Sequence, residues 1–217
     1  MPDDLQTIYQ RRFSGDEVYR SGVWKVLVSD WFSRYIPPDG NVLDLGCGYG
    51  DFINSLSVSS RYAMDLNPDS RQYLQPGVKL IQQDCSATWP LQNDSLDLVF
   101  SSNFFEHLPT KSTLEAALRQ AWRCLRPGGR LIAMGPNIKY VPGAYWDYWD
   151  HYLPLTDASM AEGLQLVGFK IEETIPRFLP YTMAGGPHYP LILLRAYLKC
   201  PFAWPFLGRQ FLVVAAK

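Results

Sequence analysis

The chain has 217 residues, a formal net charge of −1, 47% hydrophobic residues and 19% charged residues. This length holds one sizeable hydrophobic core, and the composition is typical of a globular protein. Nucleic acid held through its phosphates requires clustered Lys and Arg. No basic stripe recurs along this chain, so we expect no nucleic-acid partner.

The cysteines and the opening segment indicate the cellular setting. Cys47, Cys85, Cys124 and Cys200 form no CxxC pair, which argues against a structural zinc site or a disulfide framework. The opening segment, MPDDLQTIYQRRF, lacks the apolar run of a signal peptide. No segment reaches the roughly 18 apolar residues that a membrane span needs. We therefore expect a protein of the reducing cytoplasm.

Apolar periodicity predicts the elements of the first part of the chain. Trp24, Val28 and Trp31 recur at helical spacing and predict a helix over 16–36. Short apolar runs bounded by turn residues predict buried strands, at 41–46, 61–66, 78–83, 95–102 and 129–135.

Two further helices and a last strand complete the pattern. An apolar face predicts a helix over 112–125, and Ser112 with Glu115 fits a capping box at its start. A second helix is predicted over 156–168, and a final strand over 210–216. Strands that alternate with helices predict an α/β fold with a mostly parallel sheet covered on both faces.

A glycine-rich turn, VLDLGCGYGDF, follows the first predicted strand and opens a helix. Glycines let the backbone turn tightly and approach a ligand, while the helix start presents unpaired N–H groups. Asp44, Asp65 and Asp84 lie at the carboxyl ends of three predicted strands, where open α/β sheets bind ligands. The pattern predicts a nucleotide pocket in which Asp65 accepts hydrogen bonds from a ribose.

Two kinds of nucleotide cofactor compete for this pocket. A dinucleotide fold prefers G-x-G-x-x-G, but the position of the third glycine holds Asp51, which would repel a pyrophosphate. S-adenosylmethionine carries no phosphate, and its cationic groups suit a pocket with acids and aromatic rings. The residues therefore favour S-adenosylmethionine over a nicotinamide cofactor.

Five segments resemble, in order and spacing, the motifs of class I S-adenosylmethionine-dependent methyltransferases: VLDLGCGYG, MDLNPD, QQDCS, LDLVFSSNFFEHL and LRPGGRLIAMGPN. The resemblance covers about residues 41–137 and is closest to the small-molecule group called type 11 or type 12. It implies a Rossmann-like, doubly wound sheet of seven strands in the order 3-2-1-4-5-7-6, with the last strand antiparallel and helices on both faces. It also implies S-adenosylmethionine as methyl donor and S-adenosylhomocysteine as product.

The resemblance assigns the first cofactor contacts by position. Gly46, Cys47 and Gly48 would lie against the methionine part of the cofactor. Asp65 would hold the ribose, and Leu66 would lie beside the adenine.

The remaining cofactor contacts follow the third and fourth strands. Asp84 and the backbone of Cys85 would contact the adenine edge. Ser102 and Asn103 would line the sulfonium end.

Histidine suits the removal of a proton from an acceptor, because its pKa lies near neutral pH. His107 follows the fourth predicted strand, and His151 lies in GAYWDYWDHYLPLT after the fifth. Asp147 and Asp150 are close enough in sequence to orient the ring of His151, although this loop could instead only tether a helix. The aromatic residues of this loop are expected to shape the acceptor pocket. His188 is expected at the surface.

We expect no metal site. Some quinone-pathway relatives carry a Glu-x-x-Glu-His pattern that has been linked to metal binding. In this chain the first position of that pattern is Asn103, a weaker ligand than a carboxylate.

We expect a single domain made of a helical cap (1–40), a cofactor-binding core (41–175) and an apolar insert (176–208) before the last strand. The part of the insert over 177–208 has an aliphatic run followed by cations. It is either a lid packed on the sheet or a surface that meets a membrane or a lipid-linked substrate.

The sequence thus predicts an enzyme that moves a methyl group to an oxygen or nitrogen of a small molecule, such as a sugar, a glycan end or a lipid-linked acceptor. Two alternatives stay open. One is an NAD(P)-dependent oxidoreductase, and the other is a non-catalytic module that keeps the cofactor pocket.

Overall fold

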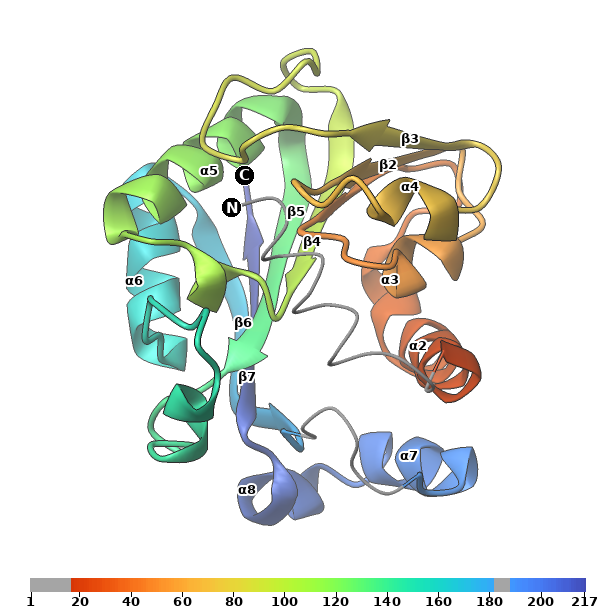
Figure 1. The fold of residues 1–217 in the computed structure, drawn as a ribbon, viewed down its shortest axis with the longest axis vertical. Coiled ribbons are helices and arrows are strands. Elements are labelled where there is room, and N and C mark those ends of the chain that lie inside the picture. The colour runs from red at the N-terminus through yellow and green to blue at the C-terminus, as the bar shows by residue number, and fades with distance from the viewer. Residues whose placement is uncertain (1–16, 182–187) are drawn as a thin grey trace.

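The computed structural model describes residues 17–181 and 188–217. A seven-stranded sheet runs through the molecule in the order β3-β2-β1-β4-β5-β7-β6 (Figure 1). Neighbouring strands from β3 to β5 are parallel, and β7 is antiparallel to both β5 and β6. The strand order and the antiparallel last strand confirm the predicted fold.

The strands have the following bounds: β1 Asn41–Leu45, β2 Ser60–Met64, β3 Val78–Ile81, β4 Leu96–Ser102, β5 Leu125–Pro136, β6 Lys170–Leu179 and β7 Gln210–Ala216. The central strands β1, β4 and β7 are buried along almost their whole length. This burial on both faces explains why they read as continuous apolar runs in the sequence.

The helices have the following bounds: α2 Glu17–Asp30, α3 Asp51–Asn54, α4 Ser70–Tyr73, α5 Lys111–Cys124, α6 Asp157–Val167, α7 Leu191–Leu198 and α8 Trp204–Leu207. Four 3₁₀ turns were also found among the described residues: η1 Phe32–Tyr35, η2 Phe105–His107, η3 Ala144–Asp147 and η4 Pro201–Ala203. Helices α5 and α6 cover one face of the sheet, and α2 and α3 cover the other (Figure 1). Each face has its own apolar cluster, so the sheet is a layer between two cores.

The start of one helix differs from the sequence prediction. Helix α5 begins after Thr110, whose hydroxyl accepts the N–H of Thr113 at 3.1 Å, so the capping box predicted at Ser112 is wrong. Thr110 is the N-cap because its extended backbone directs the hydroxyl toward the free N–H groups of the first helical turn. A capping box does open α6, between Thr156 and Ser159.

The insert before β7 begins later than predicted, because β6 continues to Leu179. Helix α7 packs on α2, where Arg195 donates to both oxygens of Asp30 at 2.6 and 2.7 Å. Trp204 of α8 packs edge-on against Phe178 of β6, with ring centroids 5.4 Å apart. In the described ranges, no helix is long and apolar enough to cross a membrane. Residues 1–16 of the predicted cap lie outside the described residues.

The glycine turn after β1 holds three residues in the left-handed region, at Gly46, Gly48 and Gly50. A Cβ at Gly46 would lie 2.1 Å from the ring of Phe104, so this position has neither the conformation nor the space for a larger residue. Beneath the turn, the buried carboxylate of Asp44 accepts the backbone N–H of Ile53 in α3. Asp44 therefore ties the end of β1 to the helix that the turn opens.

Burial raises the pKa of Asp44 from 3.8 to about 8, and the nearby charges of Asp65 and Asp51 add to this effect, while the hydrogen bond from Ile53 opposes it. Between about pH 4 and pH 8 the native protein therefore binds more protons than the unfolded chain at this position. The contribution of Asp44 to the free energy of unfolding therefore falls as the pH rises through this window.

We predict that Asp44→Asn makes this pH dependence shallower, because an amide keeps an acceptor oxygen but cannot ionise. Urea unfolding of the cofactor-free protein at several pH values between 4 and 8 measures the effect. The stability of the variant relative to the parent should rise with pH. The exposed Asp39→Asn serves as the control and should leave the curve unchanged. Parallel curves for Asp44→Asn and the parent would contradict the assignment.

Candidate active site

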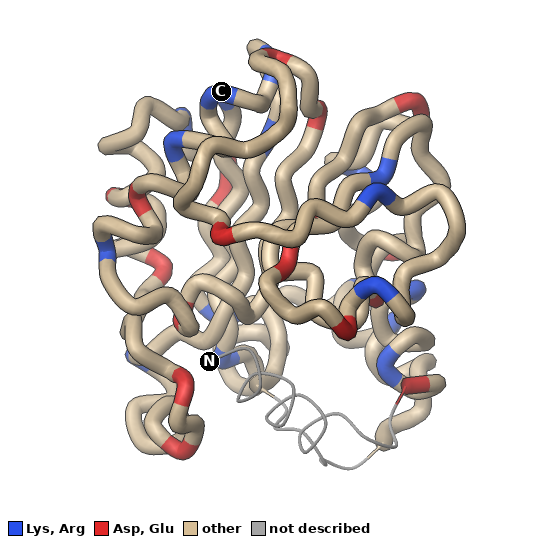
Figure 2. Tube along the Cα trace, turned by 45° about the horizontal axis from the view of Figure 1, so that its top comes forward, with Lys and Arg blue, Asp and Glu red and all other residues tan. Residues whose placement is uncertain are grey.

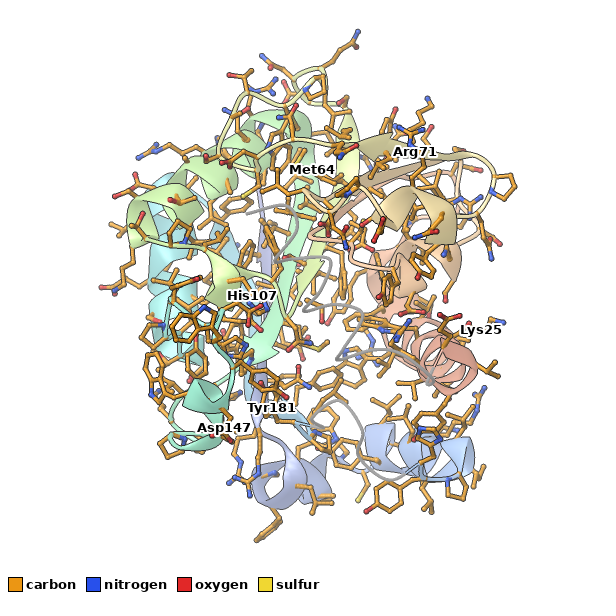
Figure 3. The ribbon with its side chains drawn as sticks, viewed as in Figure 1. Lys25, Met64, Arg71, His107, Asp147 and Tyr181 are labelled. Carbon is orange, nitrogen blue, oxygen red and sulfur yellow. The ribbon has the colours of Figure 1, made fainter. Side chains whose placement is uncertain are left out.

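A cavity of about 430 Å³ lies where the segments after β1, β2, β3 and β4 meet the loop after β5. Five of the residues predicted to bind the cofactor line it: Asp65, Leu66, Asp84, Cys85 and Asn103. Both predicted histidines, His107 and His151, line the same cavity. Figure 3 labels Met64, His107 and Tyr181, which reach this cavity from separate parts of the chain.

The carboxylate of Asp65 is held rigidly at the end of β2. Its Oδ2 accepts the N–H of Gly48 at 2.7 Å, and its Oδ1 accepts the N–H of Asn67 at 2.8 Å. Burial raises the pKa of Asp65, although these backbone donors oppose the shift. Each carboxylate oxygen has a second acceptor position, so Asp65 can still receive two hydroxyl groups.

The segment after β3 contributes a polar rim and a buried wall. Asp84 is exposed, and its Oδ1 accepts the N–H and the hydroxyl of Ser86 at 2.8 and 2.7 Å. Burial raises the pKa of Cys85 to about 12, so its thiol stays protonated at neutral pH. The Cys85 carbonyl accepts the indole N–H of Trp89 at 2.8 Å, which holds this turn in place.

Asn103 has a left-handed backbone with a φ of 48°. Its N–H donates to the carbonyl of Met134 in β5 at 2.9 Å, and its side-chain amide donates to the Ser102 hydroxyl at 3.1 Å. These bonds turn the chain sharply at the end of β4 and direct it into η2.

The other residues predicted to bind the cofactor do not line this cavity: Asp44, Gly46, Cys47, Gly48 and Ser102. Gly46 packs on the Phe104 ring, which itself lines the cavity. Asp44 and Cys47 are buried beneath the turn, where burial raises the pKa of the Cys47 thiol. Gly46, Cys47 and Gly48 belong to the glycine turn itself, and Ser102 is the last residue of β4.

The wall of the cavity opposite β2 joins η2 to the loop after η3. The Glu106 carbonyl accepts the N–H groups of Tyr152 and Leu153 at 2.9 and 3.0 Å. His107 Nδ1 lies 2.9 Å from the Asp150 carbonyl oxygen and 3.2 Å from its Oδ2. Both of these oxygens are acceptors, so Nδ1 carries the proton and the neutral ring keeps its lone pair on Nε2.

His151 is buried between aromatic rings. Its ring centroid lies 4.7 Å from Tyr145, 4.9 Å from Tyr148 and 4.8 Å from His107. Burial raises the pKa of Glu106. For His107, burial lowers the pKa but the carboxylates of Asp150 and Glu106 outweigh it, so the net pKa is raised. The wall thus concentrates two imidazoles and two carboxylates in a buried place.

The prediction that Asp147 orients His151 is corrected by the structure. Asp147 is exposed and lies away from His107 in Figure 3, and the Asp150 carboxylate is the one that contacts His107. Tyr145 of η3 and Tyr148, just after it, point inward and pack against the ring of His151. Asp147 lies between these inward positions and faces solvent.

The expectation that the aromatic residues of this loop shape the pocket holds only for Tyr148, which lines the cavity. Trp146, Trp149 and Tyr152 are exposed instead, at 56%, 87% and 55%. Tyr145 is fully buried, and its hydroxyl donates to the Leu153 carbonyl at 2.5 Å, so it supports the loop from inside.

Two residues of the cavity gave no signal in the sequence. Tyr181 comes from the segment after β6, and Gln210 begins β7. The Gln210 amide N–H donates to the Pro180 carbonyl at 2.9 Å, which orients the amide. Its buried Oε1 has no hydrogen-bond partner within residues 17–181 and 188–217. Local sequence patterns could not predict either residue in the cavity. The ends of β6 and β7 reach the site only through the pairing of strands in the sheet.

Charges of both signs are interspersed along the trace (Figure 2). Over the described residues in this view, Lys and Arg form no continuous stripe. An ion pair joins Arg20 of α2 to Asp51, the first residue of α3 after the glycine turn. Asp51 is therefore a structural acid that links two helices.

Comparison with known proteins agrees with the fold and the motifs. Residues 43–133 match the sequence profile described as a methyltransferase domain. Malonyl-[acyl-carrier protein] O-methyltransferase of Methylococcus capsulatus is 32% identical over 105 residues, which cover 44% of this chain and 37% of that protein. Sarcosine/dimethylglycine N-methyltransferase of Halorhodospira halochloris is 31% identical over 118 residues, which cover 48% of this chain and 40% of that protein. The chain thus spans less than half the length of these curated relatives in the matched regions.

A solved structure shows the same fold over the whole chain. A S-adenosylmethionine-dependent methyltransferase from Archaeoglobus fulgidus is similar with a TM-score of 0.69 at 18% identity, over 98% of this chain and 99% of that chain. The shared fold and the matched profile imply S-adenosylmethionine as the cofactor. The order of the motifs, the profile match over residues 43–133 and the strand order together make this chain similar to the class I S-adenosylmethionine-dependent methyltransferases of the type 11 group.

Proposed function

We propose that the protein transfers a methyl group from S-adenosylmethionine to an oxygen or nitrogen atom of a small molecule bound in the cavity. One observation carries the proposal: the same cavity contains the acidic end of β2 and the histidine wall made by His107 and His151. The cofactor supplies a carbon already activated by its positive sulfur. The chain has to align the acceptor with that carbon, and alignment alone can lower such a barrier by roughly 7–11 kcal/mol.

The residues around the end of β2 suit the cofactor. Asp65 has acceptor positions left for the two ribose hydroxyls, since the backbone donors occupy only one position on each oxygen. Leu66 is 53% exposed at the cavity and offers an apolar surface to the adenine. Asp84 and the backbone at Cys85 lie next to it as polar partners. The left-handed glycines would face the methionine part.

The opposite wall suits an acceptor that loses a proton. Nε2 of His107 keeps a lone pair in the neutral ring, because Nδ1 is committed to Asp150. The Gln210 Oε1 can receive a hydrogen bond from a hydroxyl or amine, since its own N–H is used by Pro180. Tyr148 and Tyr181 add aromatic surface. This combination favours a compact acceptor with a ring and at least one hydrogen-bond donor.

The proposal extends to a sugar, a glycan end or a lipid-linked acceptor. Large apolar side chains are exposed on α7, η4 and α8, with Ile192 at 67%, Phe202 at 87% and Phe206 at 78%. Lys199 lies exposed between them in the chain. Apolar residues flanked by cations are typical of surfaces that touch lipid headgroups, which supports an acceptor carried on a lipid.

We predict that S-adenosylmethionine and S-adenosylhomocysteine raise the melting temperature of the protein, while NAD and NADP do not. Asp65→Ala should weaken binding of S-adenosylhomocysteine about 10- to 100-fold in calorimetry, because a charged hydrogen-bond acceptor is lost. The exposed Asp39→Ala is the control and should bind like the parent. Stabilisation by NAD alone would support the oxidoreductase alternative, and equal affinity of Asp65→Ala would remove the ribose assignment.

We predict that His151→Ala leaves cofactor affinity nearly unchanged and lowers turnover by roughly 10²–10⁴-fold, because the wall that takes the acceptor's proton is broken. The measurement is release of S-adenosylhomocysteine with a panel of phenols, amines, sugars and lipid-linked sugars. His188→Ala is the matched control, because this histidine is exposed and stacks on Tyr19 away from the cavity. If the parent protein turned over none of the panel, the binding-module alternative would gain support.

A further inference from the structure

Three side chains of the histidine wall converge on one point. Glu106, His107 and His151 each offer one potential metal-ligand atom, and these atoms all lie within 4.8 Å of one another. The set comprises one carboxylate oxygen and two imidazole nitrogens. All three residues line the cavity.

The Glu106 carboxylate has little reason to be buried here unless it has a cationic partner. The residue is 3% exposed, and a Cβ on Gly135 would lie 3.5 Å from its Oε2, so the side chain is packed against β5. The charged groups that act on it are the His107 imidazole, which lowers its pKa, and the Asp150 carboxylate, which raises it. A buried carboxylate is stable when it is paired with a charge or bound to a metal.

His107 has the arrangement that proteins use for a metal-binding histidine. Its Nδ1 donates to the carbonyl of Asp150 at 2.9 Å, with the Asp150 carboxylate at 3.2 Å. A carboxylate on one ring nitrogen fixes the tautomer and makes the other nitrogen a better ligand. Asp150 therefore acts as a positioning residue for Nε2 of His107.

The backbone holds the two halves of the cluster together. Glu106 and His107 belong to η2, whereas His151 comes from the loop after η3. The Glu106 carbonyl accepts two N–H groups from that loop, at Tyr152 and Leu153. These two hydrogen bonds lie directly after His151 in the chain. They fix the position of His151 relative to Glu106 without a bound metal.

We propose that Glu106, His107 and His151 form a binding site for a divalent transition-metal ion of the zinc type. Two imidazoles and one glutamate make a ligand set of open zinc sites, whereas Mg²⁺ prefers oxygen ligands alone. Bond lengths of 2.0–2.1 Å put tetrahedral ligands about 3.3 Å apart, so the three side chains must close in by small rotations. The cavity leaves the remaining coordination positions to water or to an acceptor oxygen.

This proposal departs from the sequence-based expectation of no metal site, which rested on Asn103 as a weak ligand. Asn103 is not a member of the cluster, and its side chain is used by Ser102. A bound metal would occupy the lone pair on Nε2 of His107, so this nitrogen would then take no proton; the cation would instead lower the pKa of a coordinated acceptor hydroxyl, whose proton would pass to solvent. This role rests on the proposed methyl transfer, whereas the binding of metal does not.

The test uses the full chain with Cys200→Ser as background, because the exposed thiol of Cys200 could bind metal by itself. The protein is stripped with a chelator and titrated with Co²⁺, whose visible absorption reports coordination, and then with Zn²⁺ in competition. We expect one saturable site per chain that excess Mg²⁺ does not displace. Circular dichroism checks that each variant is folded.

Three variants and a control distinguish the cluster from other sites. His151→Ala and Glu106→Gln should weaken Co²⁺ binding by about 100-fold or more, and Asp150→Asn by roughly 10–100-fold, the usual effect of a residue that orients a ligand. His188→Ala should bind like the background protein, since this exposed histidine lies outside the cluster.

Binding of S-adenosylhomocysteine is measured on the same samples, so the two proposals can fail separately. Saturable Co²⁺ binding that depends on His151 and Glu106 supports the site even if no methyl transfer is found. No saturable binding, or equal affinity in His151→Ala and the background, overturns it and leaves Glu106 and His107 as an ion pair. Displacement of Co²⁺ by Mg²⁺ would also overturn it, because the ligand set would then be wrong.

Discussion

The parallel register of β3, β2, β1, β4 and β5 is the constraint on which the site depends. Parallel strands end at the same edge of the sheet, so the segments that follow them must leave from one place. The glycine turn, Asp65, the turn at Asp84 and η2 therefore lie together at that edge, although they are far apart in the sequence. Helices on both faces bury the rest of the sheet and leave this edge as the accessible part.

Burial of acids at this edge is a consequence of that arrangement. Asp44, Asp65 and Glu106 are carboxylates whose pKa values burial raises. Asp44 and Asp65 are partly compensated by backbone N–H groups, which also fasten the glycine turn to β1 and β2. Glu106 has a neighbouring imidazole instead. Acids held in this way lower the stability of the native state at neutral pH, which is typical of residues kept for binding or chemistry.

The two walls of the cavity differ in how they are held. The cofactor side is built from turns next to strand ends, and local backbone bonds define it. The histidine wall depends on long-range contacts between η2 and the loop after η3, through the Glu106 carbonyl and the Asp150–His107 pair. The fully buried ring of Tyr145 supports that loop through its bond to Leu153. Because the histidine wall is built from η2 and the loop after η3, substitutions in these segments can change the acceptor side without altering the cofactor side.

The sequence by itself determined the α/β class, the glycine turn and the acids at the strand ends, because these follow from local periodicity and from motifs in contiguous segments. The strand order followed from the resemblance of those motifs to a known family. The sequence also placed His107 and His151 at the ligand-binding edge. Only the tertiary structure decided that Asp150 contacts His107 and that Asp147 faces solvent, because this contact joins η2 to the loop after η3. It also decided that Gln210 and Tyr181 enter the cavity and that Glu106 joins the two histidines. These outcomes depend on contacts between segments that are distant in the chain, and such contacts leave no mark on local sequence patterns.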